Sequence, residues 1–447
     1  MTGAALNTDL YQLTMAAGYF EAGKTGERAT FELYVRRLPR HRKYILAAGL
    51  AQVVDYLLSL RFTAEELQYL RGLPQFARTP PAFFEMLAAL RFTGDVFAVR
   101  EGTPMFADEP FLTLRAPIVE AQVAETYLLS MIGFQSMIAT KAARVVRAAL
   151  GRSVVEFGTR RAHSPEAGVL AGRAAYVGGC EGTSNTETGL RYGVPVFGTA
   201  AHSWVMSFEQ ETEAFRHLQT LLGENTVQLI DSYDTLEGAR RAAALGRPLW
   251  GVRLDSGNLA ELVPAVRKIL DDAGLKDAKI MATGDLNEYK IHELMAARSP
   301  IDVFGVGTEL ATSADAPSLG VVYKLVETED AHGLRYHIKL SQDKHTLPGA
   351  KQVFRFAQYD LLGRANECPD NSSQCEALLR PVIIGGRLAE ALPDVHQARR
   401  HAAESLAKLP APCVSLFEAP IQEVWRVERS PQLARLYEEV RHEHGVL

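Results

Sequence analysis

The sequence has only four cysteines in 447 residues, too few for a disulfide framework. This excludes the small disulfide-stabilised class of secreted protein and makes the reducing cytoplasm the expected compartment. Cys368 and Cys375 are close in sequence, but their spacing matches no standard zinc motif. We therefore expect free thiols rather than a metal site at these two positions.

The sequence also lacks long hydrophobic runs. Its longest uncharged apolar stretch, residues 126–140, is shorter than the roughly 20 residues that span a bilayer as a helix. The start of the chain, MTGAALNTDLYQ, lacks the basic segment and the apolar core of a secretory signal. We expect neither membrane insertion nor secretion.

Positive charge is not in excess, since 48 Lys and Arg face 53 Asp and Glu, for a formal net charge of -5. Phosphate backbones are held by clustered cations, so bulk binding of nucleic acid is not expected. A local basic strip remains at Lys339, Lys344 and Lys351. It either contacts a phosphate-bearing ligand, or is a solvated edge strand protected by lysines.

The composition, 47% hydrophobic and 23% charged, is that of a globular protein long enough for two or three domains. We expect an N-terminal α+β domain over residues 1–115 and a (β/α) barrel carrying the active site over residues 116–330. Residues 331–447 form a C-terminal segment expected to pack with the N-terminal domain.

The barrel prediction rests on short apolar runs that alternate with helix-like segments, about 25 residues per unit over seven or eight units. The runs expected to form strands are residues 153–159, 175–179, 194–197, 227–230, 249–254, 279–285 and 302–308.

Outside these runs, capping and periodicity signals predict further elements. Thr63 and Glu66 are spaced as a capping box, as are Asn258 and Glu261, although Pro264 interrupts the second helix. The remaining predictions are helices over residues 118–149 and 394–409 and a hairpin that joins residues 321–327 to 334–340.

Polar residues follow the predicted barrel strands: His202, Asp231, Arg253, Asp255 and Asp285. Because the carboxyl ends of parallel strands share one rim, we expect these side chains to converge on a phosphorylated sugar. The alternatives are helix caps for the aspartates, a structural ion pair between the arginine and its neighbour, and a buried structural histidine.

Glycines and an aromatic residue lie at the same predicted rim. Gly284, Gly305 and Gly307 would let a phosphate approach the backbone, or they serve only as turn residues. Phe157 could stack on an aromatic ligand while Arg160 or Arg161 takes its carboxylate. Alternatively, the phenylalanine is in the core and the arginines are solvated.

An ordered set of motifs from residue 8 to residue 386 resembles the nicotinate phosphoribosyltransferase family. The motifs are TDLYQLTM, EFGTRRAH, GTSN, GTAAHSW, DSYDT, RLDSG, TGDLNE, FGVGTEL, VYKLV, KLSQDKHTLPGAKQV and LLRPVIIGG. The resemblance implies the irregular barrel of type II phosphoribosyltransferases and an α+β domain built from both ends of the chain. It also implies a homodimer with shared active sites.

The implied reaction joins nicotinate to 5-phosphoribosyl 1-diphosphate and releases nicotinate mononucleotide and diphosphate, as a step of NAD salvage. ATP is implied as co-substrate through a transient phosphohistidine, for which His202 is the matching position. Magnesium is expected on the diphosphate, with no protein ligands assigned.

The resemblance also assigns roles to individual residues. Phe157 would stack on the pyridine ring, Arg160 would lie by its carboxylate and Asp231 would face the ring, whereas Arg253 would meet the phosphates. Ribose, phosphate and other substrate contacts are implied for Asp255, Asp285, Gly284, Gly305, Gly307, Thr183 and Thr308, and for Asp9 and Tyr11 in the neighbouring subunit's site.

Three other interpretations stay open on sequence alone. One is a nicotinamide or quinolinate phosphoribosyltransferase, which the paired arginines and His202 disfavour. Another is a sugar-phosphate lyase or isomerase with a Schiff-base lysine, for which Lys279 and Lys324 are the candidates. The third is a metabolite-binding protein without activity.

Overall fold

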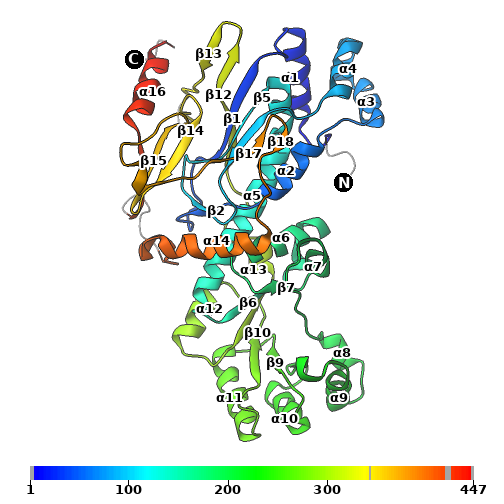
Figure 1. Ribbon diagram of the computed structural model, residues 1–447. Coiled ribbons are helices and arrows are strands. Elements are labelled where there is room, and N and C mark those ends of the chain that lie inside the picture. Colours follow the sequence, from blue (N-terminus) through cyan, green and yellow to red (C-terminus); the bar gives the residue numbers. More distant parts are fainter. Residues whose placement is uncertain (1–4, 342–343, 418–423, 444–447) are drawn as a thin grey trace. The chain divides into compact units, whose positions relative to one another are not determined.

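The computed structural model describes residues 5–341, 344–417 and 424–443 (Figure 1). The chain forms two compact units. The first, called the sheet unit, comprises Met1–Ser136, Ser318–Asp394 and Arg400–Leu447. The second, called the barrel unit, comprises Met137–Pro317 and Val395–Arg399.

The barrel unit contains a six-stranded parallel sheet in the order β7-β6-β11-β10-β9-β8. The first strand in sequence, β6, pairs with the last, β11, which is the pairing by which a barrel closes. On the other side, a parallel bridge joins Thr183 to Val196. Within residues 137–317, all of which are described, no pairing joins Val196 to β8, so the barrel is irregular. The strands are β6 (Ser153–Glu156), β7 (Gly182–Thr183), β8 (Val227–Leu229), β9 (Gly251–Leu254), β10 (Lys279–Ala282) and β11 (Val303–Val306).

Helices separate these strands along the chain, and α10 and α11 lie beside β9 and β10 (Figure 1). The helix predicted from the Asn258 cap is confirmed as α11, and those predicted over residues 118–149 and 394–409 are confirmed as α5 and α14 (Val395–Lys408). The helices are α5 (Ile118–Ala148), α6 (Pro165–Val177), α7 (Thr186–Tyr192), α8 (His202–Met206), α9 (Glu211–Leu222), α10 (Thr235–Leu245), α11 (Leu259–Asp272), α12 (Glu288–Ala296) and α13 (Thr308–Ala311).

Two of the predicted strands are wrong. Residues 175–179 were expected to form a strand, but Ala175–Val177 end helix α6, and Gly178 and Gly179 follow it. This part of α6 is buried, and a short buried apolar run does not distinguish helix from strand by periodicity. Residues 194–197 form only the single bridge at Val196, in a segment where Pro195 lacks the N–H that a ladder needs.

Both predicted caps exist, but they differ. Thr63 accepts from Glu66 N at 3.2 Å, and the Glu66 carboxylate accepts from Thr63 N at 2.7 Å, which is a complete capping box. Asn258 caps α11 through Ala260 N at 3.2 Å instead of through a box with Glu261. Pro264 lies inside α11.

The sheet unit is built around a seven-stranded sheet in the order β13-β12-β1-β5-β3-β17-β18. The N-terminal strands β1, β5 and β3 lie together in its middle, and strands from later in the chain flank them: β12 pairs with β1 and β17 pairs with β3, both antiparallel. The predicted hairpin is confirmed as β12 and β13. The strands are β1 (Arg28–Val35), β3 (Asp95–Ala98), β5 (Pro110–Pro117), β12 (Val321–Asp330), β13 (Gly333–Tyr336), β17 (Arg380–Ile384) and β18 (Arg387–Leu388).

Apolar side chains of helices and sheet form the core of this unit, with Leu33, Val53, Phe83 and Leu114 fully buried. A second sheet has the order β16-β14-β15-β19. The remaining elements are α1 (Leu10–Glu21), β2 (Ile45–Leu46), α2 (Leu50–Ser59), α3 (Ala64–Arg71), α4 (Pro81–Ala89), β4 (Pro104–Met105), β14 (Lys351–Arg355), β15 (Tyr359–Arg364), β16 (Glu376–Ala377), α14 (Val395–Lys408), β19 (Arg426–Arg429) and α16 (Pro431–Glu443). Among the described residues, none of these helices is long and apolar enough for a membrane span.

The basic strip is not a uniformly solvated face. Lys351 is buried, and its ammonium pairs with the Glu32 carboxylate at 2.7 Å and donates to Leu347 O at 3.0 Å. Burial of Glu32 raises the pKa of its carboxyl, against the charge of Lys351. The prediction of a solvated edge strand is therefore wrong at Lys351, which is a buried ion-pair partner on β14 between β16 and β15, whereas Lys344 is exposed.

Candidate active site

Four of the five predicted rim residues form one hydrogen-bonded cluster in the barrel unit: His202, Asp231, Arg253 and Asp255. Asp231 follows β8, and its Oδ1 lies 3.2 Å from His202 Nε2 at the start of α8. Its Oδ2 accepts from Asp255 N at 2.8 Å and from Ser256 Oγ at 2.6 Å. The side chain of Asp231 is 0% exposed and that of His202 is 39% exposed. The aspartate therefore holds the imidazole from inside, and part of the ring faces solvent.

Arg253 is fixed by three neighbours at the same rim. Its Nη2 donates to Asp255 Oδ1 at 2.6 Å, its Nε to Thr283 Oγ1 at 2.9 Å and its Nη1 to Thr199 Oγ1 at 2.8 Å. The guanidinium carbon lies 5.9 Å from the centre of the Phe157 ring. A cation and an aromatic ring are thus held together at this rim.

Asp255 is held as a carboxylate. Burial opposes its ionised form, but the hydrogen bond from Thr283 and the neighbouring Arg253 outweigh this cost, so the pKa of Asp255 lies below its usual value. This group therefore acts at neutral pH as a negative charge rather than as a proton donor.

Two glycines allow the rim to pack closely. Gly284 has φ +91°, and a Cβ there would lie 2.0 Å from Asp255 O. A Cβ on Gly305 would lie 2.7 Å from Cδ2 of Phe157, so the ring needs this glycine. Gly307 differs, because a Cβ there would make only ordinary contact with Phe157 O at 3.4 Å. The first two are therefore packing requirements, and their contact with phosphate stays a prediction.

The other predicted residues are less tightly held. Phe157 is half-buried, Arg160 and Arg161 are exposed on the 3-10 turn Thr159–Arg161, and Thr308 begins the four-residue helix α13. Asp285 is exposed, with φ +45°, and its carbonyl accepts from Lys290 Nζ at 2.8 Å.

Thr183 has a structural task. Its side chain is buried, and its hydroxyl donates to Glu156 Oε2 at 2.6 Å. Glu156 ends β6 and also accepts from Gly158 N; burial raises the pKa of its carboxyl. Sequence reasoning did not assign Glu156 a role, although its position directly after an apolar run is the signal that identified Asp231. It missed Thr199, Ser256 and Thr283 as well.

Asp9 and Tyr11 belong to the sheet unit. Asp9 precedes α1, and its Oδ2 accepts from Thr126 Oγ1 at 2.9 Å, whereas Tyr11 is exposed. Of the candidate Schiff-base lysines, Lys279 begins β10, at the end of the strand opposite to the rim, and Lys324 lies in β12 of the sheet unit.

Among the described residues, no group of three or more His, Cys, Asp or Glu side chains could hold a metal ion. All four cysteines are free, with Cys180 and Cys413 buried. A magnesium ion at the rim would therefore need substrate oxygens as ligands beside one or two carboxylates, which is how magnesium is commonly held on phosphates.

A parallel (β/α) barrel with an imidazole, carboxylates and a guanidinium at its strand ends is an α/β fold with a rim suited to a phosphorylated substrate. The family model for the nicotinate phosphoribosyltransferase (NAPRTase) N-terminal domain matches residues 6–133, and that for the nicotinate phosphoribosyltransferase (NAPRTase) family matches residues 152–331. The chain belongs to the nicotinate phosphoribosyltransferase family.

Relatives cover nearly the whole chain. A nicotinate phosphoribosyltransferase of Mycobacterium tuberculosis is 45% identical over 92% of this chain and 89% of its own length. One from Bacillus subtilis is 42% identical over 78% of this chain and 73% of its own length. The crystal structure of human nicotinic acid phosphoribosyltransferase is similar with a TM-score of 0.84 and 30% identity, covering 97% of this chain and 99% of that one.

Proposed function

We propose that this protein is a nicotinate phosphoribosyltransferase that acts in NAD salvage in the cytoplasm. It transfers the phosphoribosyl group of 5-phosphoribosyl 1-diphosphate to nicotinate, giving nicotinate mononucleotide and diphosphate. The observation that carries the proposal is the cluster of His202, Asp231, Arg253 and Asp255 at one barrel rim, in a chain that belongs to this family.

The reaction requires the site to stabilise charges and does not require it to remove a proton from nicotinate. The pyridine nitrogen attacks the anomeric carbon with its own lone pair, the bond from that carbon to the diphosphate oxygen breaks, and diphosphate leaves. The site must orient the ring and stabilise a cationic ribosyl centre and a departing anion. Asp255, an ionised carboxylate, suits the cationic ribosyl centre, and the Arg253 guanidinium suits the departing diphosphate.

Nicotinate would be held by Phe157 and Arg160. The Phe157 ring is half-buried with a guanidinium over it, and Arg160 is exposed three residues further on. A flat ring stacked on the phenylalanine would place its carboxylate within reach of an arginine, which binds carboxylates through a planar fork. Magnesium would be held mainly by the diphosphate.

We propose that ATP acts through His202. Asp231 is a hydrogen-bond acceptor beside Nε2, which puts the imidazole proton on Nε2 and leaves the lone pair on Nδ1. Nδ1 would attack the γ-phosphorus of ATP, the bond to the ADP oxygen would break, and water would later release the phosphate. The phosphorylated ring would add negative charge beside the diphosphate site and so couple ATP to substrate binding.

We also propose a homodimer in which Asp9 and Tyr11 contribute to the partner's site. Three large apolar side chains, Leu10, Tyr11 and Met15, are exposed at the start of α1. An exposed apolar patch of this kind fits a surface that a second subunit covers.

The test compares nicotinate and nicotinamide as acceptors with phosphoribosyl diphosphate, with and without ATP. We expect transfer to nicotinate, stimulated by ATP, and little transfer to nicotinamide. His202→Ala should lose the ATP stimulation and keep slow transfer, whereas the exposed His217→Ala in the same unit should respond like the wild type. A His202→Ala variant that ATP still stimulates fully would remove the histidine from the mechanism, and preference for nicotinamide would overturn the substrate assignment.

A further inference from the structure

The sheet unit contains a cavity that the proposed reaction does not use. Its volume is about 550 Å³, within the roughly 300–1,000 Å³ of small-molecule sites. Five segments line it: the residues after β3, the end of β14 with the turn that follows it, residues 373–380, the second half of α14 with Leu409, and Trp425 before β19. All its lining residues belong to the sheet unit, and none belongs to the barrel rim.

The lining is cationic in a protein whose net charge is -5. Arg100, Arg355, Arg380 and Lys408 line the cavity together with a single carboxylate, Glu376. Arg355 is paired with Asp360 at 2.7 Å and Arg380 with Glu376 at 2.9 Å. The exposed Arg100 and Lys408 add to these pairs, so cations outnumber carboxylates along the lining, which favours an anionic ligand.

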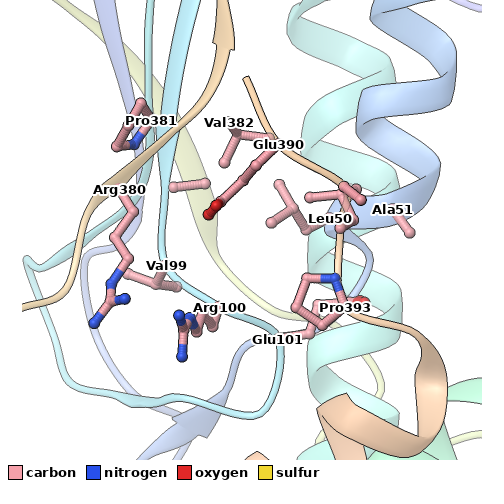
Figure 2. A pocket seen from close by; sticks show the side chains of 13 residues that line it. Leu50, Ala51, Val99, Arg100, Glu101, Arg380, Pro381, Val382, Glu390 and Pro393 are labelled. Atoms are coloured by element: carbon pink, nitrogen blue, oxygen red, sulfur yellow. The ribbon is translucent and has the colours of Figure 1, made fainter. Parts of the chain in front are cut away.

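Arg100 and Arg380 also line a second cavity of about 210 Å³ in the same unit. Figure 2 shows the side chains of Arg100, Arg380 and Glu390 at this cavity. The planar fork of an arginine guanidinium matches the geometry of phosphate oxygens.

The larger cavity also offers flat and uncharged groups. Phe356 is half-buried and stacks on Tyr359 with ring centres 4.7 Å apart. His401 lies 3.0 Å from Thr103 Oγ1, and burial together with Arg100 lowers the pKa of its imidazole. Near neutral pH the ring is therefore a neutral hydrogen-bonding group, and a ligand would meet cations, an aromatic edge and neutral polar atoms together.

We propose that this cavity is a second binding site, for a nucleotide: its phosphates would lie against Arg100, Arg380 and Lys408, and its base against Phe356. The phosphate contacts would supply most of the affinity, and the aromatic residue would distinguish a nucleotide from inorganic diphosphate. The site is separate from the barrel rim in the residues that form it, so its occupation can be measured without the transfer reaction.

Cys375 supplies a local probe because it lines the cavity and is only half-buried. In a Cys368→Ser variant it is the one cysteine that is not buried. We would measure its alkylation by iodoacetamide with mass spectrometry, against increasing ADP. A ligand at about nine times its Kd leaves about a tenth of the sites empty, so alkylation should slow about tenfold at that concentration.

The arms of the experiment separate the possible causes. In the Cys368→Ser background, Arg100→Gln with Arg380→Gln should abolish the protection, whereas Arg61→Gln, an exposed arginine outside both cavities, should keep it. Lys408→Gln is the milder variant if the double change impairs folding. His202→Ala should leave protection unchanged, which separates this site from the proposed reaction.

Three results would overturn the proposal. They are alkylation that ADP does not slow, protection that survives the loss of the cavity arginines, and equal protection by inorganic diphosphate. The last would show that the base contributes nothing and that the cavity holds inorganic anions.

Discussion

Two clusters of charged side chains in the barrel unit use the same chemistry in different surroundings. At the rim, His202 and Asp255 remain partly exposed beside Arg253. In the interior, Lys141 and Glu288 are 1% and 0% exposed, with their charged atoms 2.5 Å apart. Glu288 also accepts from Arg144 Nε at 3.0 Å.

The comparison separates charges that can meet a substrate from charges that hold the fold. Lys141 pairs with Asp315 at 2.8 Å as well, so the interior cluster is saturated by the protein's own groups. Glu288 begins α12, three residues after Asp285 at the rim. The interior cluster therefore anchors the helix that follows a rim loop, and the rim cluster keeps atoms that can reach solvent.

The largest expected effect is a loss of stability when the interior cluster is broken. Glu288→Ala would leave Lys141 and Arg144 without their shared carboxylate, and breaking a buried ion pair costs about 3–5 kcal/mol of unfolding free energy. Urea denaturation measures this loss. The exposed Glu293→Ala on the same helix should change stability by no more than about 0.5 kcal/mol. A loss below about 1 kcal/mol in Glu288→Ala would contradict the anchoring role.

The second prediction concerns a variant that disrupts the rim cluster. Asp231→Asn removes the charge that orients His202, and we expect kcat/KM with nicotinate and ATP to fall by about 10²–10³, the usual effect of losing one preorganised electrostatic contact. Asparagine keeps an oxygen for Asp255 N, so the stability loss should stay near 1 kcal/mol.

The matched control for this variant is Asp272→Asn, which alters an exposed ion pair with Lys268 and should leave kcat/KM unchanged. If Asp231→Asn lost stability as strongly as Glu288→Ala but kept its activity, the two clusters would have exchanged roles.

The convergence of the rim could be predicted because it depends on one rule. Strand ends in a parallel sheet meet at one edge, so Asp231, Arg253 and Asp255 were placed correctly from the runs that precede them. The helical end of α6 could not be predicted, because its buried alanine, tyrosine and valine residues suit a strand equally well.

Contacts between segments distant in the chain could not be predicted from the sequence either. Glu156 meets Thr183 only because β6 and β7 are neighbours in register. Lys141 meets Glu288 across 147 residues, and nothing in the pattern of helix 118–149 identifies that partner. Such pairs follow from packing, which periodicity within a segment does not encode.

The smallest expected effect concerns pH and tests whether Asp255 is held as a charge. Burial disfavours its ionised form, but Thr283 and Arg253 more than compensate, so its pKa is lower folded than unfolded. The carboxylate then stabilises the fold fully above the unfolded value, about pH 3.9, and this contribution is lost as pH falls through the lower folded pKa. The difference in unfolding free energy between wild type and Asp255→Asn should therefore be constant between pH 7 and 5 and shrink only below about pH 4. Denaturation at several pH values measures it, with Asp272→Asn as baseline. A difference that vanished between pH 7 and 5 would mean that the Asp255 carboxylate is protonated near neutral pH, and the rim would then lack the fixed negative charge that distinguishes it from the neutralised interior cluster.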